Sequence, residues 1–312
     1  MSEIIGLPAP SVVDWPRDEA AHDGLPWEIW WITAIVRSGR RRFSSHVMLT
    51  HLPGARLGVS ATITDLELER EFARRITAEP DQVVLATDRL EVATELGSFR
   101  GSFQDGYSLT AHLDDDAGFD LALQPTTPVL HNCGGGQFAL GKLTTTQYSI
   151  GGLVAAGILR VGGQVFEVEG RAWYDRQWIH SGSLEDSGGA FTWFGVSLDS
   201  GVTLSLWDTS MRPQGWHTWA TVARLDGTHI VTPAEPAAHS AQGRFRTPQG
   251  HDVPRRWTLA IPALQAQLQV DQRLAQDAPG RFFYTGALEV TGTCEGQSVN
   301  GYGFCDLVGW AN

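Results

Sequence analysis

The sequence is poor in several residue types, and each shortage excludes a class of protein. Only three of its 312 residues are cysteines, and none of them forms a CxxC pair. An odd number of cysteines without paired spacing does not indicate a disulfide framework, so we expect ordinary thiols in a reducing compartment. Methionine is as scarce, with three residues, which predicts little Met-rich helix packing.

Charged residues are also few. They make up 19% of the chain, and the formal net charge is −12. Binding to a phosphate backbone needs clustered Lys and Arg. The one basic run, Arg40-Arg41-Arg42, follows Ser38-Gly39 and is typical of a solvated turn. We therefore expect no nucleic-acid partner.

Long apolar runs are missing as well. No stretch approaches the roughly 18 apolar residues that a membrane-spanning helix needs. The N-terminal residues show no basic start followed by an apolar core, which is the pattern of a secretory signal. These two observations predict a cytoplasmic protein without a membrane span.

Motifs for cofactors and metals are not found either. No GxGxxG or GxxxxGK[ST] loop precedes a helix, and there is no GxSxG elbow. His46 and His51 stand at odd spacing and would point to opposite faces of a strand, which does not favour a metal site. The run from His131 to Gln137 holds Cys133 and a series of glycines, and it is more typical of a tight bend than of a Cys–His nucleophile. We expect no cofactor and no metal.

The residues that are plentiful indicate a β protein. Hydrophobic residues make up 42% of the chain, with 12 Trp and 35 Gly. Short apolar segments at roughly 8–12 residue spacing, broken by turn residues and without alternating helices, are typical of antiparallel barrels or sandwiches. Up-and-down barrels of this kind often enclose a small apolar ligand. Residues 1–24 are expected to lie over the surface as an arm, and residues 64–79 fit a helix or a strand equally well.

The stretch from Gly170 to Trp178 concentrates the chemistry of the chain. In a strand, side chains alternate between the two faces. Trp173, Asp175 and Gln177 would then share one face, which offers a carboxylic acid between an aromatic wall and an amide. Ordinary core packing, with Asp175 paired to an arginine, explains the same residues. Burial would raise the pKa of Asp175, whereas Arg171 or Arg176 nearby would lower it, and the pattern leaves the balance open.

These residues resemble a known family. The stretch is similar to the G-x-A-W-x-D-x-x-W signature of the carotenoid 1,2-hydratase and AttH-like family. Residues 28–31 resemble its N-terminal E-W-W-Y stretch, residues 193–201 its W-F-x-x-x-L-x-x-G hairpin, and residues 301–310 its G-x-G-Y-x-E-L-x-G-Y ending. The sequence departs from the hydratases at Arg176-Gln177, where His-Asn or His-Glu is commoner.

The resemblance implies an all-β fold of two consecutive lipocalin-like antiparallel β-barrel domains, at residues 1–185 and 186–312. It also implies a ligand pocket at or near their junction. The implied activity is that of a cofactor-independent enzyme of natural-product biosynthesis acting on a hydrophobic polyene or polyketide-like substrate. Asp175 and Tyr174 are the catalytic candidates. The substrate-binding candidates are Trp30, Trp31, Tyr148, Trp173, Gln177, Trp178 and Trp193.

Four functions remain open from the sequence, and one of them is a structural or partner-binding module whose pocket is filled by its own side chains. An acid such as Asp175 would serve the addition of water to a double bond, with aromatic faces stabilising a cation by about 0.5–2 kcal/mol per ring. A Diels–Alderase-like cyclase would need mainly a shaped pocket and one hydrogen-bond donor. A non-catalytic carrier of a hydrophobic metabolite would use the same fold. The oligomeric state is not predicted.

Overall fold

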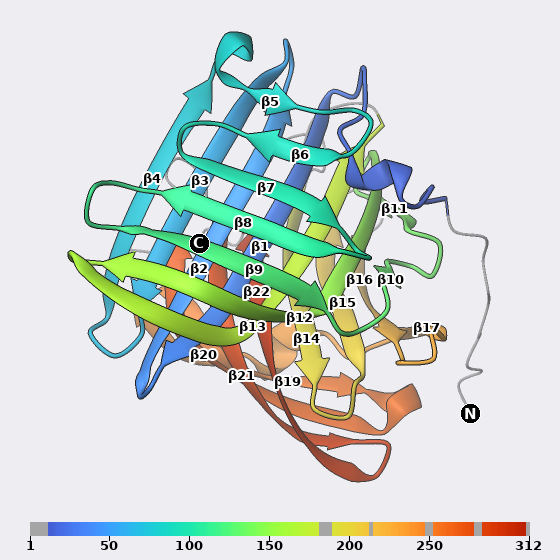
Figure 1. Ribbon diagram of the computed structural model, residues 1–312. Helices are drawn as coiled ribbons and strands as arrows, with labels where there is room; N and C mark the ends of the chain where they lie inside the picture. The colour runs from blue at the N-terminus through green and yellow to red at the C-terminus, as the bar shows by residue number, and fades with distance from the viewer. Residues whose placement is uncertain (1–11, 181–188, 212–214, 247–251, 278–282, 310–312) are drawn as a thin grey trace. The chain divides into compact units, whose positions relative to one another are not determined.

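The computed structural model describes residues 12–180, 189–211, 215–246, 252–277 and 283–309 (Figure 1). These residues form almost only antiparallel strands and divide into two units. Residues 12–127 and 144–180 make the first unit, and residues 128–143 cluster with the chain from residue 189 onward in the second. The predicted domain boundary at 185/186 lies outside the described residues and stays a prediction.

The sheet of the first unit runs in the order β4-β3-β2-β1-β13-β12-β9-β8-β7-β6-β5. Every neighbouring pair along this path is antiparallel. The strands are β1 Trp27–Ser38, β2 Arg41–Leu52, β3 Arg56–Asp65, β4 Arg70–Ala78, β5 Val84–Leu85, β6 Leu90–Ala93, β7 Gly97–Ser102, β8 Gly106–His112, β9 Gly118–Pro125, β12 Leu143–Val161 and β13 Gln164–Ile179.

The sheet of the first unit curls so that its two halves share one interior. Strands β6–β9 pass across β1–β4 in Figure 1. Tyr174 on β13 contacts Phe99 on β7 and Tyr107 on β8, with ring centroids 4.8 and 5.7 Å apart. Because side chains alternate along each strand, the same register that buries Tyr174 inside turns Asp175 to the other face.

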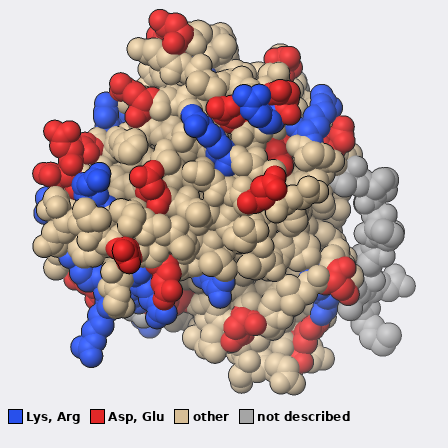
Figure 2. Space-filling view, in the orientation of Figure 1, with Lys and Arg blue, Asp and Glu red and all other residues tan. Residues whose placement is uncertain are grey.

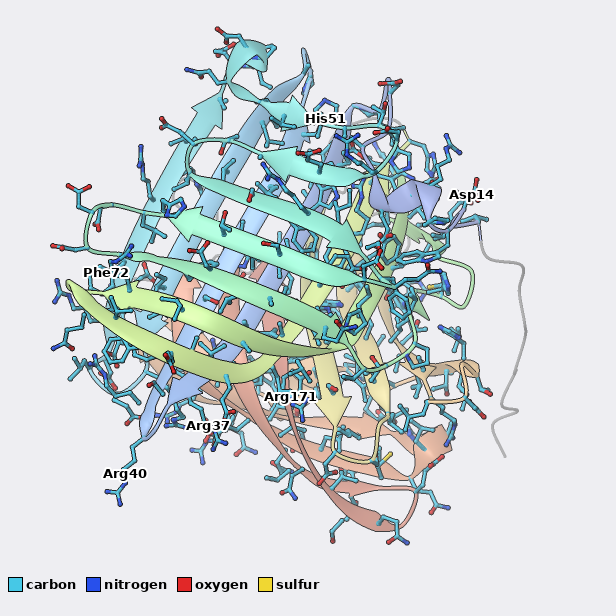
Figure 3. All side chains as sticks on the ribbon, in the orientation of Figure 1. Asp14, Arg37, Arg40, His51, Phe72 and Arg171 are labelled. Atoms are coloured by element: carbon cyan, nitrogen blue, oxygen red, sulfur yellow. The ribbon has the colours of Figure 1, made fainter. Side chains whose placement is uncertain are left out.

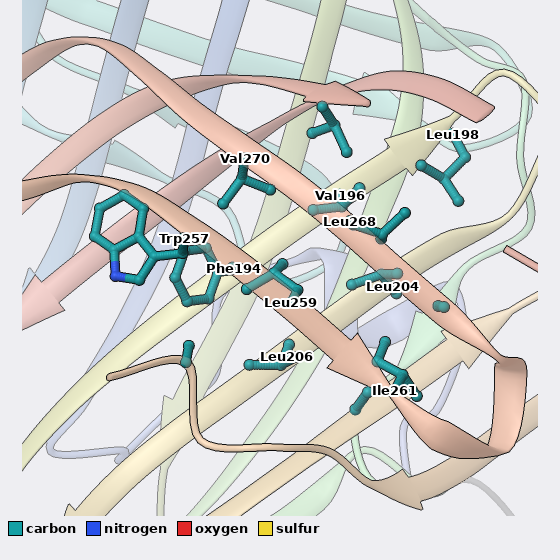
Figure 4. Close-up of a cluster of buried hydrophobic side chains, with 14 of the residues drawn as sticks. Phe194, Val196, Leu198, Leu204, Leu206, Trp257, Leu259, Ile261, Leu268 and Val270 are labelled. Carbon is teal, nitrogen blue, oxygen red and sulfur yellow. The ribbon is translucent and has the colours of Figure 1, made fainter. Parts of the chain in front are cut away.

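The second unit contains a sheet in the order β17-β16-β15-β14-β22-β21-β20-β19-β18. Figure 4 shows its core, in which the rings of Phe194 and Trp257 meet edge to face at 5.4 Å. The strands of the unit are β10 Leu130–His131, β11 Gln137–Leu140, β14 Gly189–Leu198, β15 Thr203–Met211, β16 Gly215–Ala223, β17 His229–Pro233, β18 Gln242–Arg246, β19 Asp252–Ile261, β20 Ala266–Asp277, β21 Phe283–Cys294 and β22 Gln297–Val308.

Helical structure is limited to single 3₁₀ turns among the described residues. They are η1 Arg17–Glu19, η2 Pro80–Gln82, η4 Ala237–Ser240 and η5 Pro262–Leu264. The predicted bend after His131 is confirmed, since Cys133 and Gly134 both have positive φ. The expectation of an all-β protein built from lipocalin-like antiparallel barrels is also confirmed.

Residues 64–79 form a β-hairpin and not a helix. β3 ends at Asp65, the chain turns through Glu69 at φ 50°, and β4 pairs back along β3. Phe72 pairs with Ile63 in this ladder. A spacing of four residues places side chains on one face of a helix and also on one face of a strand, so pairing with β3 decided the outcome.

The N-terminal arm is buried where the sequence predicted a surface position. Asp18, Glu19, Ala20 and Ala21 are all at most 5% exposed. The Glu19 carboxylate accepts a hydrogen bond of 2.7 Å from the Tyr107 hydroxyl, inside the first unit. The prediction is therefore wrong for these residues, because paired polar side chains compensate their burial. Residues 1–11 lie outside the described residues.

The surface carries both signs of charge. On the face that Figure 2 shows, Asp and Glu side chains alternate with Lys and Arg among many uncharged residues. This interspersed pattern agrees with a chain whose charged residues are only 19% of the total.

Candidate functional site

Asp175 lies on a strand that is paired along both edges. β13 runs between β1 and β12, and Asp175 stands opposite Trp31 on one side and Ser149 on the other. The register confirms the predicted alternation along β13. Trp173, Asp175 and Gln177 project from one face, and Tyr174, Arg176 and Trp178 project from the face that lines the interior of the first unit.

The Asp175 carboxyl group is held in a buried, hydrogen-bonded position. Asp175 is only 5% exposed, and its Oδ1 accepts a hydrogen bond of 2.8 Å from the Trp173 indole nitrogen. Burial raises the pKa of Asp175 to about 7, although hydrogen bonds from Ser149, Trp173 and Gln147 act in the opposite direction. A carboxyl group with this pKa keeps its proton in a large share of molecules at neutral pH and is able to donate it.

Neither arginine of the central stretch stands beside this carboxyl group. Arg176 points to the opposite face of β13. Arg171 shares the face of Asp175 but is four residues away and exposed (Figure 3). Burial consequently determines the direction of the Asp175 pKa shift, which the sequence alone left open.

Arg176 instead closes a buried ion-pair network. Its guanidinium pairs with the Glu28 carboxylate, donates to the carbonyl of Ala20 at 2.8 Å, and lies 3.9 Å over the Trp30 ring. Burial would raise the pKa of Glu28, but Arg176 together with hydrogen bonds from His22 and His51 holds it below its usual range. This network ties the arm to β1 and β13, which is a structural role.

Tyr174 and Tyr148 face the interior, away from Asp175. Their hydroxyl groups are 3.3 Å apart, and both side chains are completely buried. Glu19 lies in the same interior, where burial raises its pKa to about 7 against hydrogen bonds from Tyr107 and Phe103. No sequence pattern predicts the position of Glu19, because the arm has no strand pattern that would place it inside a barrel.

The other candidates fall into three places. Trp31, Trp173 and Gln177 share the face of Asp175, and Gln177 Nε2 donates to the Thr145 hydroxyl at 3.0 Å. Trp30 and Trp178 belong to the interior, with Tyr148 and Tyr174. Trp193 is in the second unit, on β14, and its indole nitrogen donates to the Ser205 hydroxyl at 2.9 Å. The two catalytic candidates, Asp175 and Tyr174, thus lie on opposite faces of one strand.

The sequence predicts no role for His46 on β2 beyond a metal site, which its spacing does not favour. His46 is 5% exposed, and its ring centroid lies 5.2 Å from that of Trp31, on the face of Asp175. His51 points to the interior face and hydrogen-bonds Glu28 at 2.9 Å, as the odd spacing predicted. Within the described residues, no group of three or more His, Cys, Asp or Glu side chains is arranged to hold a metal ion.

The described part of the chain also contains no helix of the length and apolar character needed to cross a membrane. The cytoplasmic location stays a prediction.

Two curated relatives share about a quarter of their aligned residues with the chain. Dehydratase asqC of Emericella nidulans is 27% identical over 205 residues, or 61% of this chain. Kievitone hydratase of Fusarium solani subsp. phaseoli is 25% identical over 206 residues, or 62% of this chain. The alignments span 58% of the length of each relative.

Solved structures with the same fold cover nearly the whole chain. A protein described as AttH from Nitrosomonas europaea superposes with a TM-score of 0.81 at 18% identity, over 97% of this chain and 100% of that one. Kievitone hydratase from Nectria haematococca gives 0.79 at 18% identity, over 98% and 96%. CghA with Sch210972 gives 0.59 at 14% identity, over 98% and 96%.

The sequence model of one protein family matches almost the whole chain. It is described as AttH-like and matches residues 7–310, a range that includes every candidate residue named above. The chain therefore belongs to the AttH-like family.

Proposed function

We propose that the chain is an enzyme that adds water to, or removes water from, a hydrophobic metabolite, with Asp175 as the acid. The observation that carries this proposal is a buried carboxyl group whose pKa is raised to about 7 between two tryptophans. The two curated relatives named hydratase and dehydratase support it, since these names describe one reaction in opposite directions.

The chemistry follows from a neutral acid in an apolar setting. In hydration, the O–H bond of Asp175 breaks and a C–H bond forms at one alkene carbon, which leaves a cation on the neighbouring carbon and a carboxylate on Asp175. Water then adds to the cation through its oxygen and loses a proton. In dehydration, the Asp175 carboxylate takes the C–H proton back. Such proton transfer contributes typically 10²–10⁴-fold to a rate.

The surroundings of Asp175 fit a short-lived cation. Trp31 and Trp173 stand on the same face of the sheet, one opposite Asp175 and one two residues along β13. An aromatic face within about 6 Å of a cation stabilises it by roughly 0.5–2 kcal/mol. The hydrogen bond from Trp173 to Oδ1 also fixes the orientation of the carboxyl group.

The test is the Asp175→Asn variant, which keeps the side-chain volume and an oxygen acceptor for the Trp173 indole. Hydrophobic alkenes, with kievitone among them because a relative is named for it, are incubated in ¹⁸O-labelled water and analysed by mass spectrometry. We expect the variant to lose 10²–10⁴-fold of the hydration rate. Asp120→Asn is the matched control, because Asp120 lies exposed on β9.

Other outcomes would favour the alternatives. Wild-type turnover by Asp175→Asn would remove Asp175 as the acid and favour a cyclase that works by shape. A ligand that binds and is recovered chemically unchanged from the wild type would favour a carrier.

A further inference from the structure

His46 presents an unused nitrogen on the face of Asp175. The residue is 5% exposed, and its ring hydrogen-bonds the backbone of Ile32. Among the residues that the structure describes, His46 Nδ1 has no hydrogen-bond partner. Buried polar atoms are nearly always paired, so an unpaired one is explained by an ordered water, an ion, strain or a catalytic role.

The state of the ring identifies what that nitrogen offers. Burial and the positive charge of Arg75 lower the pKa of His46 to about 3, so the imidazole is neutral at pH 7. A neutral ring has one N–H donor and one lone pair. In the tautomer with the proton on Nε2, the Nδ1 atom carries the lone pair and is an acceptor for an O–H group.

The register gives the spacing between this acceptor and the acid. Asp175 stands opposite Trp31, Trp31 stands opposite Met48, and His46 is two residues along β2 from Met48. With the usual strand spacing and rise, the Cα atoms of Asp175 and His46 are about 12 Å apart. Both side chains project from the same face, with the Trp31 indole between them and touching the His46 ring.

That spacing suits an alkene and one water molecule in line. In such a line, the acid contacts one alkene carbon, the water lies above the next carbon, and the base is hydrogen-bonded to that water. The distance from the acid oxygen to the base nitrogen is then about 9–10 Å. The Trp31 ring would then lie under the reacting carbons.

We propose that His46 holds the attacking water through Nδ1 and takes its proton as the new C–O bond forms. This inference rests on the proposed function. As water oxygen bonds to the cation, one O–H bond breaks and an N–H bond forms at Nδ1, giving an alcohol and an imidazolium. The imidazolium then returns its proton through solvent to the Asp175 carboxylate, so the sum is alkene plus water to alcohol.

Burial and the groups around His46 oppose a lasting imidazolium, so the ring can hold a proton only briefly. Thr33 and Thr62, its partners on β1 and β3, do not titrate in this range. The charged residues on the same face of β4 are Arg75 and Glu71, and Arg75 disfavours a lasting positive charge on the ring. A water bonded to a cation is a strong acid, so a weak base is sufficient to deprotonate it.

The test separates proton donation from water capture. Para-prenylphenol, whose alkene gives a tertiary cation, is incubated in D₂O with wild type, His46→Asn and His46→Phe, and alcohol formation and deuterium in the recovered alkene are measured. Asn keeps an acceptor near the Nδ1 position but is no base. We expect both variants to form alcohol at least 100-fold more slowly while still returning deuterated alkene, because Asp175 remains.

The controls make each result decisive. His112→Asn, at an exposed position on β8, is expected to match wild type, and thermal unfolding followed by Trp fluorescence checks that each variant is folded. Wild-type rates of alcohol formation in both folded His46 variants would overturn the role of His46 alone. Loss of deuterium from the recovered alkene in those variants would do the same. A wild type that forms neither alcohol nor deuterated alkene would overturn the proposed hydration, and this inference with it.

Discussion

The buried pair of Arg176 and Glu28 makes a sharp prediction about stability. The Arg176→Met change removes the ion pair, the hydrogen bonds to the carbonyls of Ala20 and Ile29, and the guanidinium over Trp30. Both charged side chains are fully buried, so Glu28 is left as a poorly compensated charge. Breaking a pair in this way typically costs about 3–5 kcal/mol. We expect the free energy of unfolding to fall by that amount at pH 8.

The same change should depend on pH. Burial lowers the pKa of His22, but hydrogen bonds with Asp18 and Glu28 outweigh it, so the pKa lies above its usual value. The positive charge of Arg176 acts against this rise. Without Arg176, His22 therefore takes up a proton more readily and partly replaces the missing charge. The loss of stability should be smaller at pH 6 than at pH 8.

Urea unfolding followed by intrinsic tryptophan fluorescence measures this effect. Arg37→Met is the matched control, because Arg37 pairs with Glu169 at 3.0 Å with side chains 65% and 71% exposed. Exposed pairs contribute about 0–1 kcal/mol. The double change Glu28→Gln, Arg176→Met should recover part of the loss. An Arg176→Met protein as stable as Arg37→Met would refute the reasoning.

Two further predictions concern the central stretch. The pKa of Asp175, raised to about 7, means that the folded protein keeps a proton between about pH 4 and 7 that the unfolded chain has lost, so stability falls as pH rises through this window. The Asp175→Asn variant should not show that fall, and at pH 8 its free energy of unfolding should exceed that of wild type by about 2–4 kcal/mol. Equal urea midpoints of variant and wild type at pH 8 would contradict this stability prediction. The hydration rate of wild type should drop above pH 7. In Gly170→Ala, the new Cβ would lie 2.1 Å from the Ile35 carbonyl oxygen, so the β1–β13 ladder must shift and the melting temperature should fall by several degrees. Gly58→Ala is the control, because its new Cβ would make ordinary contacts at 3.6 Å or more, and its melting temperature should change less.

Much of the architecture was readable from local patterns. Turn residues and short apolar segments predicted an all-β chain, because alternation and tight turns are properties of a few consecutive residues. The alternation of side chains along a strand correctly predicted that Asp175 and Tyr174 lie on opposite faces, and likewise His46 and His51. Where a spacing fits two structures, as in residues 64–79, local pattern was not sufficient, and pairing with β3 selected the hairpin.

The candidate site depended on contacts between residues far apart in the chain. The sequence predicted a carboxyl group between an aromatic wall and an amide. Only the register of β13 with β1 and β12 and the ion pair of Arg176 with Glu28 showed that this arginine lies on the other face. That arrangement leaves burial to set the pKa of Asp175. His46 and Glu19 reached their positions through strand order and through the buried arm, which no short pattern encodes. The sequence thus determined which groups each face carries, whereas the protonation of those groups was decided by tertiary burial, because desolvation depends on everything packed around them.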